Sequence, residues 1–178
     1  MNSINKNQPE NNHEDLMADK AVDKLKDLAR GAKTCFFCTV PSSSNSKGTR
    51  PMTIQRVDDD GCFWFVSAND SHQDLDIRQN PDVKLYFQGS THSDFLYVEG
   101  TATITEDKAI IKELWEPMFK VWFTEGENDP RISVIKITPT VGYYWDNKNG
   151  NAIAAIKMLM GVITGKTLDD SIEGDIIV

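Results

Sequence analysis

The chain has 178 residues, enough for one domain with a sizeable core, and 39% of them are hydrophobic, as in ordinary globular proteins. Its net charge of −8 argues against nucleic acids and anionic membranes as partners, because an acidic surface repels phosphate groups. No apolar run approaches the roughly 20 residues that span a bilayer, and residues 1–15 lack the apolar segment of a secretory signal, so we expect a soluble, cytoplasmic protein.

The first predicted element is a polar, Asn-rich tail, residues 1–12, which we expect to be disordered. Helical spacing of apolar residues then predicts a helix over 14–30, capped by Asn12 and ended by Gly31 in the left-handed conformation. Aromatic and β-branched runs predict strands over 35–40, 50–57, 62–67, 83–88 and 95–105. Between them lie a Ser/Asn-rich loop (41–48), a hairpin turn (58–61) and a short helix (71–80).

The second half begins with a helical stretch from residue 105 that Pro117 interrupts, followed by a second short helix and an acidic loop over 124–130. We expect a strand over 132–138, a second strand over 141–145 that pairs with it, and an amphipathic helix over 152–163 capped by Gly165. An acidic, loose tail, residues 167–178, ends the chain. Many short strands joined by turns indicate an antiparallel barrel or sandwich, and no Gly-rich nucleotide-binding motif supports a Rossmann or P-loop fold.

Cys35 and Cys38 form a C-x-x-C pair, which invites a redox or zinc interpretation. Their neighbours indicate a strand instead, and residues three apart in a strand point to opposite faces. No second pair completes a zinc site. We therefore interpret Cys35, Cys38 and Cys62 as structural cysteines and predict no metal site.

Two segments could hold an anion. Ser71 is the expected N-cap of the 71–80 helix, with Asp74 three residues later, and the free N–H groups at such a helix start can bind phosphate. Arg50 begins a strand and could form a forked contact with phosphate. The plainer alternatives are a simple capped helix and a solvent-exposed charge beside a turn.

Aromatic residues concentrate in the second half, at Trp115, Trp122 and 143–145. Such side chains stack on planar rings or form dimer interfaces, but core packing is the favoured interpretation of Trp115 and Trp122. No Ser-His-Asp or Cys-His arrangement can be placed, so we predict no catalytic side chain. From the residues alone, the expectation is a β-barrel with helices that holds a phosphorylated planar ligand.

Six short motifs occur in the order and at the intervals of one known family. They are Arg50-Pro-Met52, Phe63-Trp-Phe-Val-Ser67 followed by Ser71, Ile77-Arg-Gln-Asn-Pro81-Asp-Val83, Val98-Glu-Gly100, Leu114-Trp-Glu-Pro117 with Trp122-Phe123 and Asp129-Pro130, and Pro139 with Tyr143-Tyr-Trp145-Asp. In this pattern the chain resembles the pyridoxamine phosphate oxidase-like FMN-binding split-barrel superfamily, and more narrowly its general stress protein branch. The resemblance covers about residues 15–166.

The resemblance implies a single split-barrel domain over residues 13–166, a six-stranded antiparallel Greek-key barrel with flanking helices. It also implies a homodimer with FMN at the two-fold interface. The residues that it places at the flavin are Arg50, Met52 and Thr53 from the second strand, Val66 and Ser67 from the third, Ser71, His72 and Gln73 at the phosphate, and Trp145 from the partner subunit.

Two departures from the family pattern bear on function. Gln73 stands where the family commonly has a lysine, which predicts a weaker hold on phosphate. The Arg-x-His that follows the tryptophan in true pyridoxamine phosphate oxidases is missing after Trp145, which argues against that reaction. The leading hypothesis is a flavin-binding stress protein with low flavin oxidoreductase activity. The alternative is a binding module that stores or senses FMN, or another planar anion, without turnover.

Overall fold

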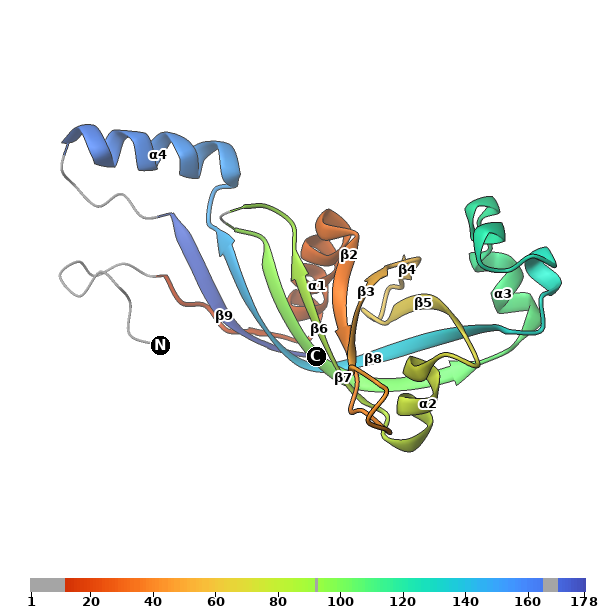
Figure 1. The fold of residues 1–178 in the computed structure, drawn as a ribbon. Coiled ribbons are helices and arrows are strands. Elements are labelled where there is room, and N and C mark those ends of the chain that lie inside the picture. The colour runs from red at the N-terminus through yellow and green to blue at the C-terminus, as the bar shows by residue number, and fades with distance from the viewer. Residues whose placement is uncertain (1–11, 92, 165–169) are drawn as a thin grey trace.

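A computed structural model describes residues 12–91, 93–164 and 170–178. Its centre is one strongly curved, mainly antiparallel sheet (Figure 1). The strands are β1 (Leu16–Met17), β2 (Thr34–Cys38), β3 (Thr49–Thr53), β4 (Arg56–Val57), β5 (Phe63–Ala68), β6 (Asp82–Gln88), β7 (Phe95–Thr105), β8 (Ile132–Asn147) and β9 (Ser171–Ile177). The helices are α1 (Asp19–Ala32), α2 (His72–Gln79), α3 (Lys108–Leu114) and α4 (Asn151–Thr164), with short 3₁₀ turns η1 (Pro117–Val121) and η2 (Gly126–Asn128).

The long strand β8 organises the sheet. On one side it pairs with β7 along its whole length, and on the other it pairs first with β5 and then with β9. Pro139 lies in the short stretch of β8 between the residues that pair with β5 and those that pair with β9. Proline has no N–H, and at this position no hydrogen bond to either strand is lost. The prediction of two separate strands over 132–138 and 141–145 that pair with each other is therefore wrong, because both segments pair with β7 instead.

The barrel is split between β3 and β5. β3 pairs with β2, and β5 pairs with β4 and β8, but no ladder joins β3 to β5 within the described residues. Only where β4 approaches does the Gln55 N–H donate to the Trp64 carbonyl, at 2.9 Å. This arrangement confirms the predicted split-barrel class, and the open seam leaves room for a ligand.

The core fills the barrel from both sides of the seam. Phe37 of β2 and Phe65 of β5 meet edge to face, with ring centroids 5.2 Å apart, and both are buried. The buried apolar face of α1 covers one end of this core through Leu25 and Leu28. A second apolar cluster lies under α3 and η1 on the outer side of β5 and β8, so those two elements are fixed beside the seam.

The N-terminal helix starts and ends later than its sequence predicts. β1 pairs in parallel with β9, so residues 16–17 are extended and α1 begins only at Asp19. Ala18, not Asn12, occupies the N-cap position, and Lys33, not Gly31, takes the left-handed conformation at the C-terminus (φ 63°). The tertiary pairing with β9 has overridden the local helical pattern.

The C-terminal segment is a strand where a loose tail was expected. β9 pairs with β8 along its length and with β1 on its other edge. Ile176 is fully buried and Gly174 faces inward, whereas Glu173 and Asp175 lie on the opposite face, so the acidic residues conceal a period of two. Residues 1–11 of the predicted N-terminal tail, residues 167–169 and the predicted cap Gly165 lie outside the described residues.

The cysteines have the predicted strand geometry. Cys35 is buried, Cys38 is half-exposed on the other face of β2, and both are free thiols. Among the described residues, no group of three His, Cys, Asp or Glu side chains could hold a metal ion. The described helices include none that is long and apolar enough to cross a membrane.

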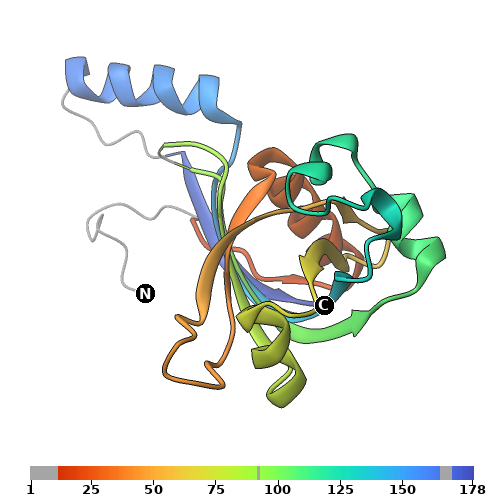
Figure 2. The same cartoon turned by 45° about the vertical axis from the view of Figure 1, so that its right-hand side comes forward.

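The helix predicted over 152–163 is present as α4, which follows β8 after a short turn. It lies apart from the barrel in both views of the fold (Figures 1 and 2). At the other end of the sheet, α3 and η1 lie beside the open seam (Figure 1).

Candidate functional site: two adjoining cavities at the open seam

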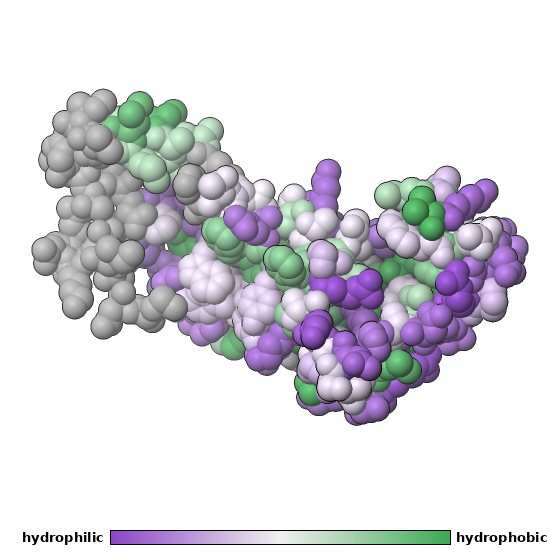
Figure 3. Space-filling model, in the orientation of Figure 1, coloured by the Kyte–Doolittle hydropathy of each residue, from purple (hydrophilic) through white to green (hydrophobic). Residues whose placement is uncertain are grey.

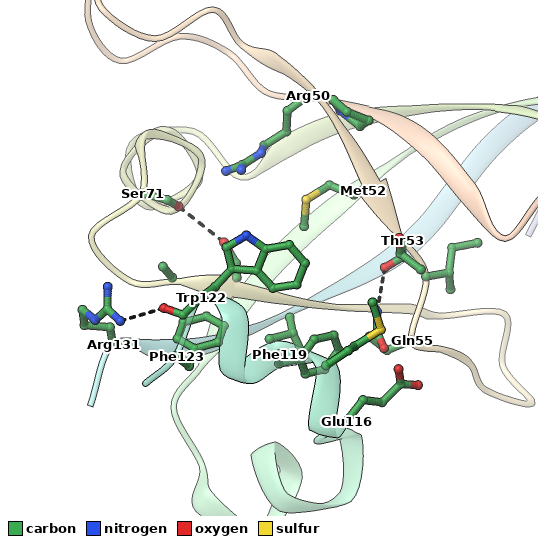
Figure 4. Close-up of a pocket in the computed structure, with 16 residues that line it drawn as sticks. Arg50, Met52, Thr53, Gln55, Ser71, Glu116, Phe119, Trp122, Phe123 and Arg131 are labelled. Atoms are coloured by element: carbon green, nitrogen blue, oxygen red, sulfur yellow. Dashed lines mark hydrogen bonds between the residues drawn. The ribbon is translucent and has the colours of Figure 1, made fainter. Parts of the chain in front are cut away.

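A cavity of about 520 Å³ opens where β3 and β5 part. β3 and its continuation form one wall, β5 forms the floor, and η1 with the residues after it forms the opposite wall (Figure 4). Its lining residues are Arg50, Pro51, Met52, Thr53, Ile54, Gln55, Val66, Ser67, Ala68, Ser71, Glu116, Met118, Phe119, Trp122, Phe123 and Arg131. The structure thus brings together six of the nine predicted site residues, namely Arg50, Met52, Thr53, Val66, Ser67 and Ser71.

A second cavity, of about 420 Å³, adjoins the first and shares Arg50 and Ser71 with it. His72 and Gln73 line this second cavity together with Lys47 from the loop between β2 and β3. Its wall combines the cationic Lys47 and Arg50 with the start of α2, where backbone N–H groups and the positive end of the helix dipole are found, and it also carries the carboxylates of Asp70 and Asp76.

The start of α2 is built by a serine–aspartate network. Ser71 caps the helix, since its Oγ accepts from the Asp74 N–H at 3.2 Å, as the sequence predicted. The buried Asp74 carboxylate accepts from Ser71 Oγ at 3.2 Å and from Ser133 Oγ of β8 at 2.7 Å. Burial raises the pKa of Asp74, although the bonds from Ser133, Ser67 and Ser71 act to lower it. The network fixes two cavity hydroxyls, those of Ser67 and Ser71.

A second buried carboxylate holds the loop between β2 and β3 against α2. Asp76 accepts hydrogen bonds from Thr39 Oγ1 at 2.8 Å, from the Ser42 N–H at 2.7 Å, and from the hydroxyls of Ser42 and Ser46. Burial by itself would raise the pKa of Asp76, but these hydrogen bonds outweigh it and lower the pKa to about 2. The Ser-rich composition of the loop is explained by this contact, which fixes the loop that carries Lys47.

Of the three predicted phosphate contacts, Ser71, His72 and Gln73, only Gln73 is buried. Its side chain is only 4% exposed, and neither its amide oxygen nor its amide nitrogen has a hydrogen-bond partner among the described residues. A buried, unpaired amide costs folding free energy, of the order of 1–3 kcal/mol. Because Gln73 lines the second cavity, a polar ligand there is the natural partner for this amide.

Of the two arginines that line the first cavity, one is held in an ion pair and the other is not. Arg131 is bound to both oxygens of Asp129, at 3.2 and 3.1 Å, and donates to the Trp122 carbonyl at 2.8 Å (Figure 4). These bonds lower the pKa of Asp129. Arg50, in contrast, is exposed, and its side chain forms no hydrogen bond or ion pair within the described residues. Arg50 is therefore available for an anionic ligand, and it borders both cavities.

The η1 wall was not foreseen. Phe119 is buried and packs edge to face on Trp115 at 5.7 Å, which agrees with core packing for Trp115. Trp122 does not pack in the core: it is 59% exposed and lines the cavity. The expectation for Trp122 fails because its side chain stays exposed at the cavity, whereas Phe119 and Phe123, which also line the cavity, are buried in the cluster beneath it. The proline-and-aromatic cluster of residues 115–123 was the signal for this wall.

Trp145 lies elsewhere. It lines a third hollow, of about 620 Å³, on the outer face of the sheet, which meets the first cavity only at Pro51. This outer face is aromatic: Phe36, Tyr86, Tyr97 and Tyr143 lie in register on four neighbouring strands. Phe36 is 57% exposed and Tyr86 46%. Exposed aromatic surface of this kind is typical of a protein interface.

The two joined cavities fit a ligand with a flat apolar part and an anionic end. Met52, Val66, Phe119 and Trp122 supply apolar and aromatic surface in the first. The second adds the free Arg50 side chain and the start of α2, and the buried, unpaired Gln73 amide lies beside it.

Comparison with known families decides the relationship. Residues 20–169 match the model of the family described as "Pyridoxamine 5'-phosphate oxidase like". The chain belongs to this family. The matched range contains all lining residues of both cavities and strands β2 to β8, and it confirms the resemblance stated from the sequence motifs.

Solved structures agree with the family assignment. A general stress protein 26 from Jannaschia superposes with a TM-score of 0.68 at 20% identity, covering 90% of this chain and 96% of that one. The general stress protein 26 of Bacillus anthracis gives 0.59 at 26% identity, covering 69% and 92%. A general stress FMN/FAD binding protein from Xanthomonas citri gives 0.57 at 22% identity, covering 68% and 85%. These matches support the general stress protein branch of the family.

Proposed function

We propose that this chain is an FMN-binding general stress protein that works as a homodimer and has low flavin oxidoreductase activity. The observation that carries the proposal is the pair of joined cavities, one aromatic and one rich in hydrogen-bond donors, with Arg50 and Ser71 at their junction. The similar Xanthomonas citri protein, which its name describes as FMN/FAD binding, supports a flavin as the ligand.

In this proposal the flavin ring occupies the first cavity and the phosphate the second. Met52 and Thr53 would line the ring from β3, and Val66 and Ser67 from β5. The phosphate would accept hydrogen bonds from Ser71, His72 and Gln73 at the start of α2, where the helix dipole favours an anion. Arg50 would reach the phosphate from β3 and pair its charge.

The bound flavin would supply the redox chemistry, by taking up and giving up a hydride equivalent, and the protein would position it. Phe119 of η1 and Trp122, which follows η1, form an aromatic wall on one side of the cavity. Glu116 and the two arginines are the ionisable groups on the described lining of this cavity. Glu116 is exposed.

The homodimer follows from the outer face of the sheet. A second copy would cover the aromatic row around Tyr86 and Tyr97, and a two-fold axis would bring Trp145 of each protomer to the flavin of the other. This explains why Trp145 lies outside the cavity of its own chain. Light scattering should give twice the 20.0 kDa mass of the chain, and a monomer at micromolar concentration would contradict the proposal.

A binding module without turnover is the second candidate. The absence of a histidine or a buried carboxylate among the described lining residues of the first cavity favours it. Stopped-flow absorbance separates the two candidates, because NADH or NADPH should bleach the bound flavin only if the protein is an oxidoreductase. No bleaching with either donor would favour the binding module.

The test of flavin binding itself is titration of the protein, freed of ligand, with FMN, FAD and riboflavin by fluorescence quenching. We expect FMN to bind more tightly than riboflavin, because the second cavity would contact the phosphate. Equal affinity for FMN and riboflavin would contradict the assignment of that cavity. If FAD binds more tightly than FMN, the proposed cofactor is FAD and not FMN.

A further inference from the structure

Two apolar patches remain exposed at opposite ends of the sheet. On α4, Ile156, Met158 and Leu159 are 59–63% exposed. We call Met118, Val121 and Trp122 the η1 patch; their exposed fractions are 60%, 78% and 59%. Both regions show as hydrophobic surface in Figure 3, over α4 at the upper left and over η1 at the upper right. Side chains of this size and exposure usually mark an interface.

The apolar composition of α4 indicates that another surface packs against this helix. Of the residues in α4, only Lys157 is charged, and its ammonium group is bound to the buried Asp170 carboxylate. A helix that is apolar on nearly all sides is normally buried. At 14 residues α4 is only about 21 Å long, too short to cross a bilayer. A helix that lies on a membrane surface usually carries several Lys or Arg residues, which α4 lacks.

The base of α4 is firmly attached to the barrel. Asp170 accepts from the Asn149 N–H at 3.2 Å and from Asn149 Nδ2 at 2.7 Å, and its carbonyl accepts from the Lys148 N–H at 2.7 Å. β8 and β9 remain paired up to Asn147 and Ser171. These contacts fix the start of α4 relative to the sheet. α4 begins at Asn151, six residues after Trp145.

We infer that α4 of each protomer packs on the η1 patch of the other and closes the mouth of the first cavity. This inference rests on the homodimer proposed above. A two-fold axis that brings Trp145 of one chain to the β3–η1 cavity of the other also carries α4 there, because only five residues separate Trp145 from Asn151. In Figure 1, α4 and η1 lie above the sheet at its opposite ends, which is the placement that an exchange of the two between protomers requires.

A second copy of the chain is the occupant that explains both patches. Each patch would cover the other, and the cavity would gain an apolar lid beside Trp122 from the partner. The flavin site is then complete only in the dimer. The partner's α4 narrows the opening of the cavity, so that only small substrates can enter.

Crosslinking between the two patches tests the contact directly. In a Cys38→Ser background, which removes the half-exposed thiol, Leu159→Cys is combined with Val121→Cys and treated with a short bis-maleimide. We expect a covalent dimer from the double variant and none from either single variant. Leu159→Cys combined with Leu75→Cys is the control, because Leu75 is also an exposed apolar residue, at 45% against 78% for Val121, but lies on α2 and not on η1.

Each result has a defined meaning. Absence of the crosslink in a protein that is dimeric and binds FMN overturns the inference and leaves the proposed function standing. A covalent dimer from Leu159→Cys alone also overturns it, because α4 would then pair with α4. A monomeric or flavin-free protein counts against the proposed function itself. α4-dependent binding to phosphatidylcholine vesicles would overturn the inference in favour of a lipid surface.

A second measurement does not depend on introduced cysteines. In Leu159→Asp, studied as a dimer saturated with FMN, iodide should quench the bound flavin several-fold more strongly than in wild type, because α4 no longer packs over the cavity. Hydrogen exchange should show residues 152–160 protected in the wild-type dimer and exposed in Leu159→Asp. Unchanged quenching and exchange in the variant would overturn the inference.

Discussion

Ser71 and Asp74 bind each other twice at the start of α2. The Ser71 hydroxyl accepts from the Asp74 backbone N–H and donates to the Asp74 carboxylate, both at 3.2 Å. Asp74 also accepts from Ser133, so the helix start is tied to β8. The residue that would meet a phosphate is thus oriented by a buried carboxylate behind it.

The first prediction concerns the pH dependence of stability. Burial raises the pKa of Asp74, so the folded protein holds this proton more readily than the unfolded chain. Its contribution to the free energy of unfolding is therefore complete at low pH and is lost as the pH rises through the folded pKa. Asn at this position does not titrate, so the stability of Asp74→Asn relative to wild type should rise as the pH increases from the unfolded value of 3.8 through the folded pKa of Asp74. Urea unfolding across this range measures it, and a constant difference would refute the prediction.

The second prediction concerns the loop between β2 and β3. Asp76→Asn weakens the bonds from Thr39, Ser42 and Ser46, and should lower stability at neutral pH by about 1–3 kcal/mol. Because the pKa of Asp76 is lowered to about 2, its contribution is present above the unfolded pKa of 3.8 and is lost as the pH falls toward 2. Limited proteolysis should cut the variant within residues 41–48 first. Asp82→Asn, an exposed carboxylate, is the control.

The third prediction concerns Gln73. A lysine there would add a charge-assisted contact to phosphate, typically about 1.5–3 kcal/mol, so Gln73→Lys should bind FMN roughly tenfold more tightly. Because the position is buried, the ligand-free variant should also unfold more readily than wild type. Gln73→Met is the uncharged control. If riboflavin binding improves equally, or FMN binding does not improve, residues 71–73 are not the phosphate site.

The fourth prediction concerns the C-x-x-C pair. Cys35→Ser together with Cys38→Ser should leave flavin binding and any redox activity intact, because the two thiols face opposite sides of β2. Burial, with a smaller effect from Cys38, raises the pKa of Cys35 to about 12, so a thiol reagent should label Cys38 well before Cys35. A folded double variant that loses activity would show a redox role for the pair.

Local patterns in the sequence determined much of this protein. The aromatic and β-branched run over residues 95–105 predicted β7 with its observed ends, and Ser71 with Asp74 predicted the cap of α2. The spaced motifs indicated the family, and with it the split-barrel class. These features depend on residues that are close in the chain, where steric preference and hydrogen bonding act without a distant partner.

Only the tertiary structure decided the rest. β9 is a strand because β8 and β1 pair with it, and Pro139 lies inside β8 because the ladder changes partner there. The η1 wall faces β3 across more than sixty residues of chain. Such relationships depend on which distant segments meet. A short segment that becomes a strand only by pairing with a distant one does not show this in its own residues.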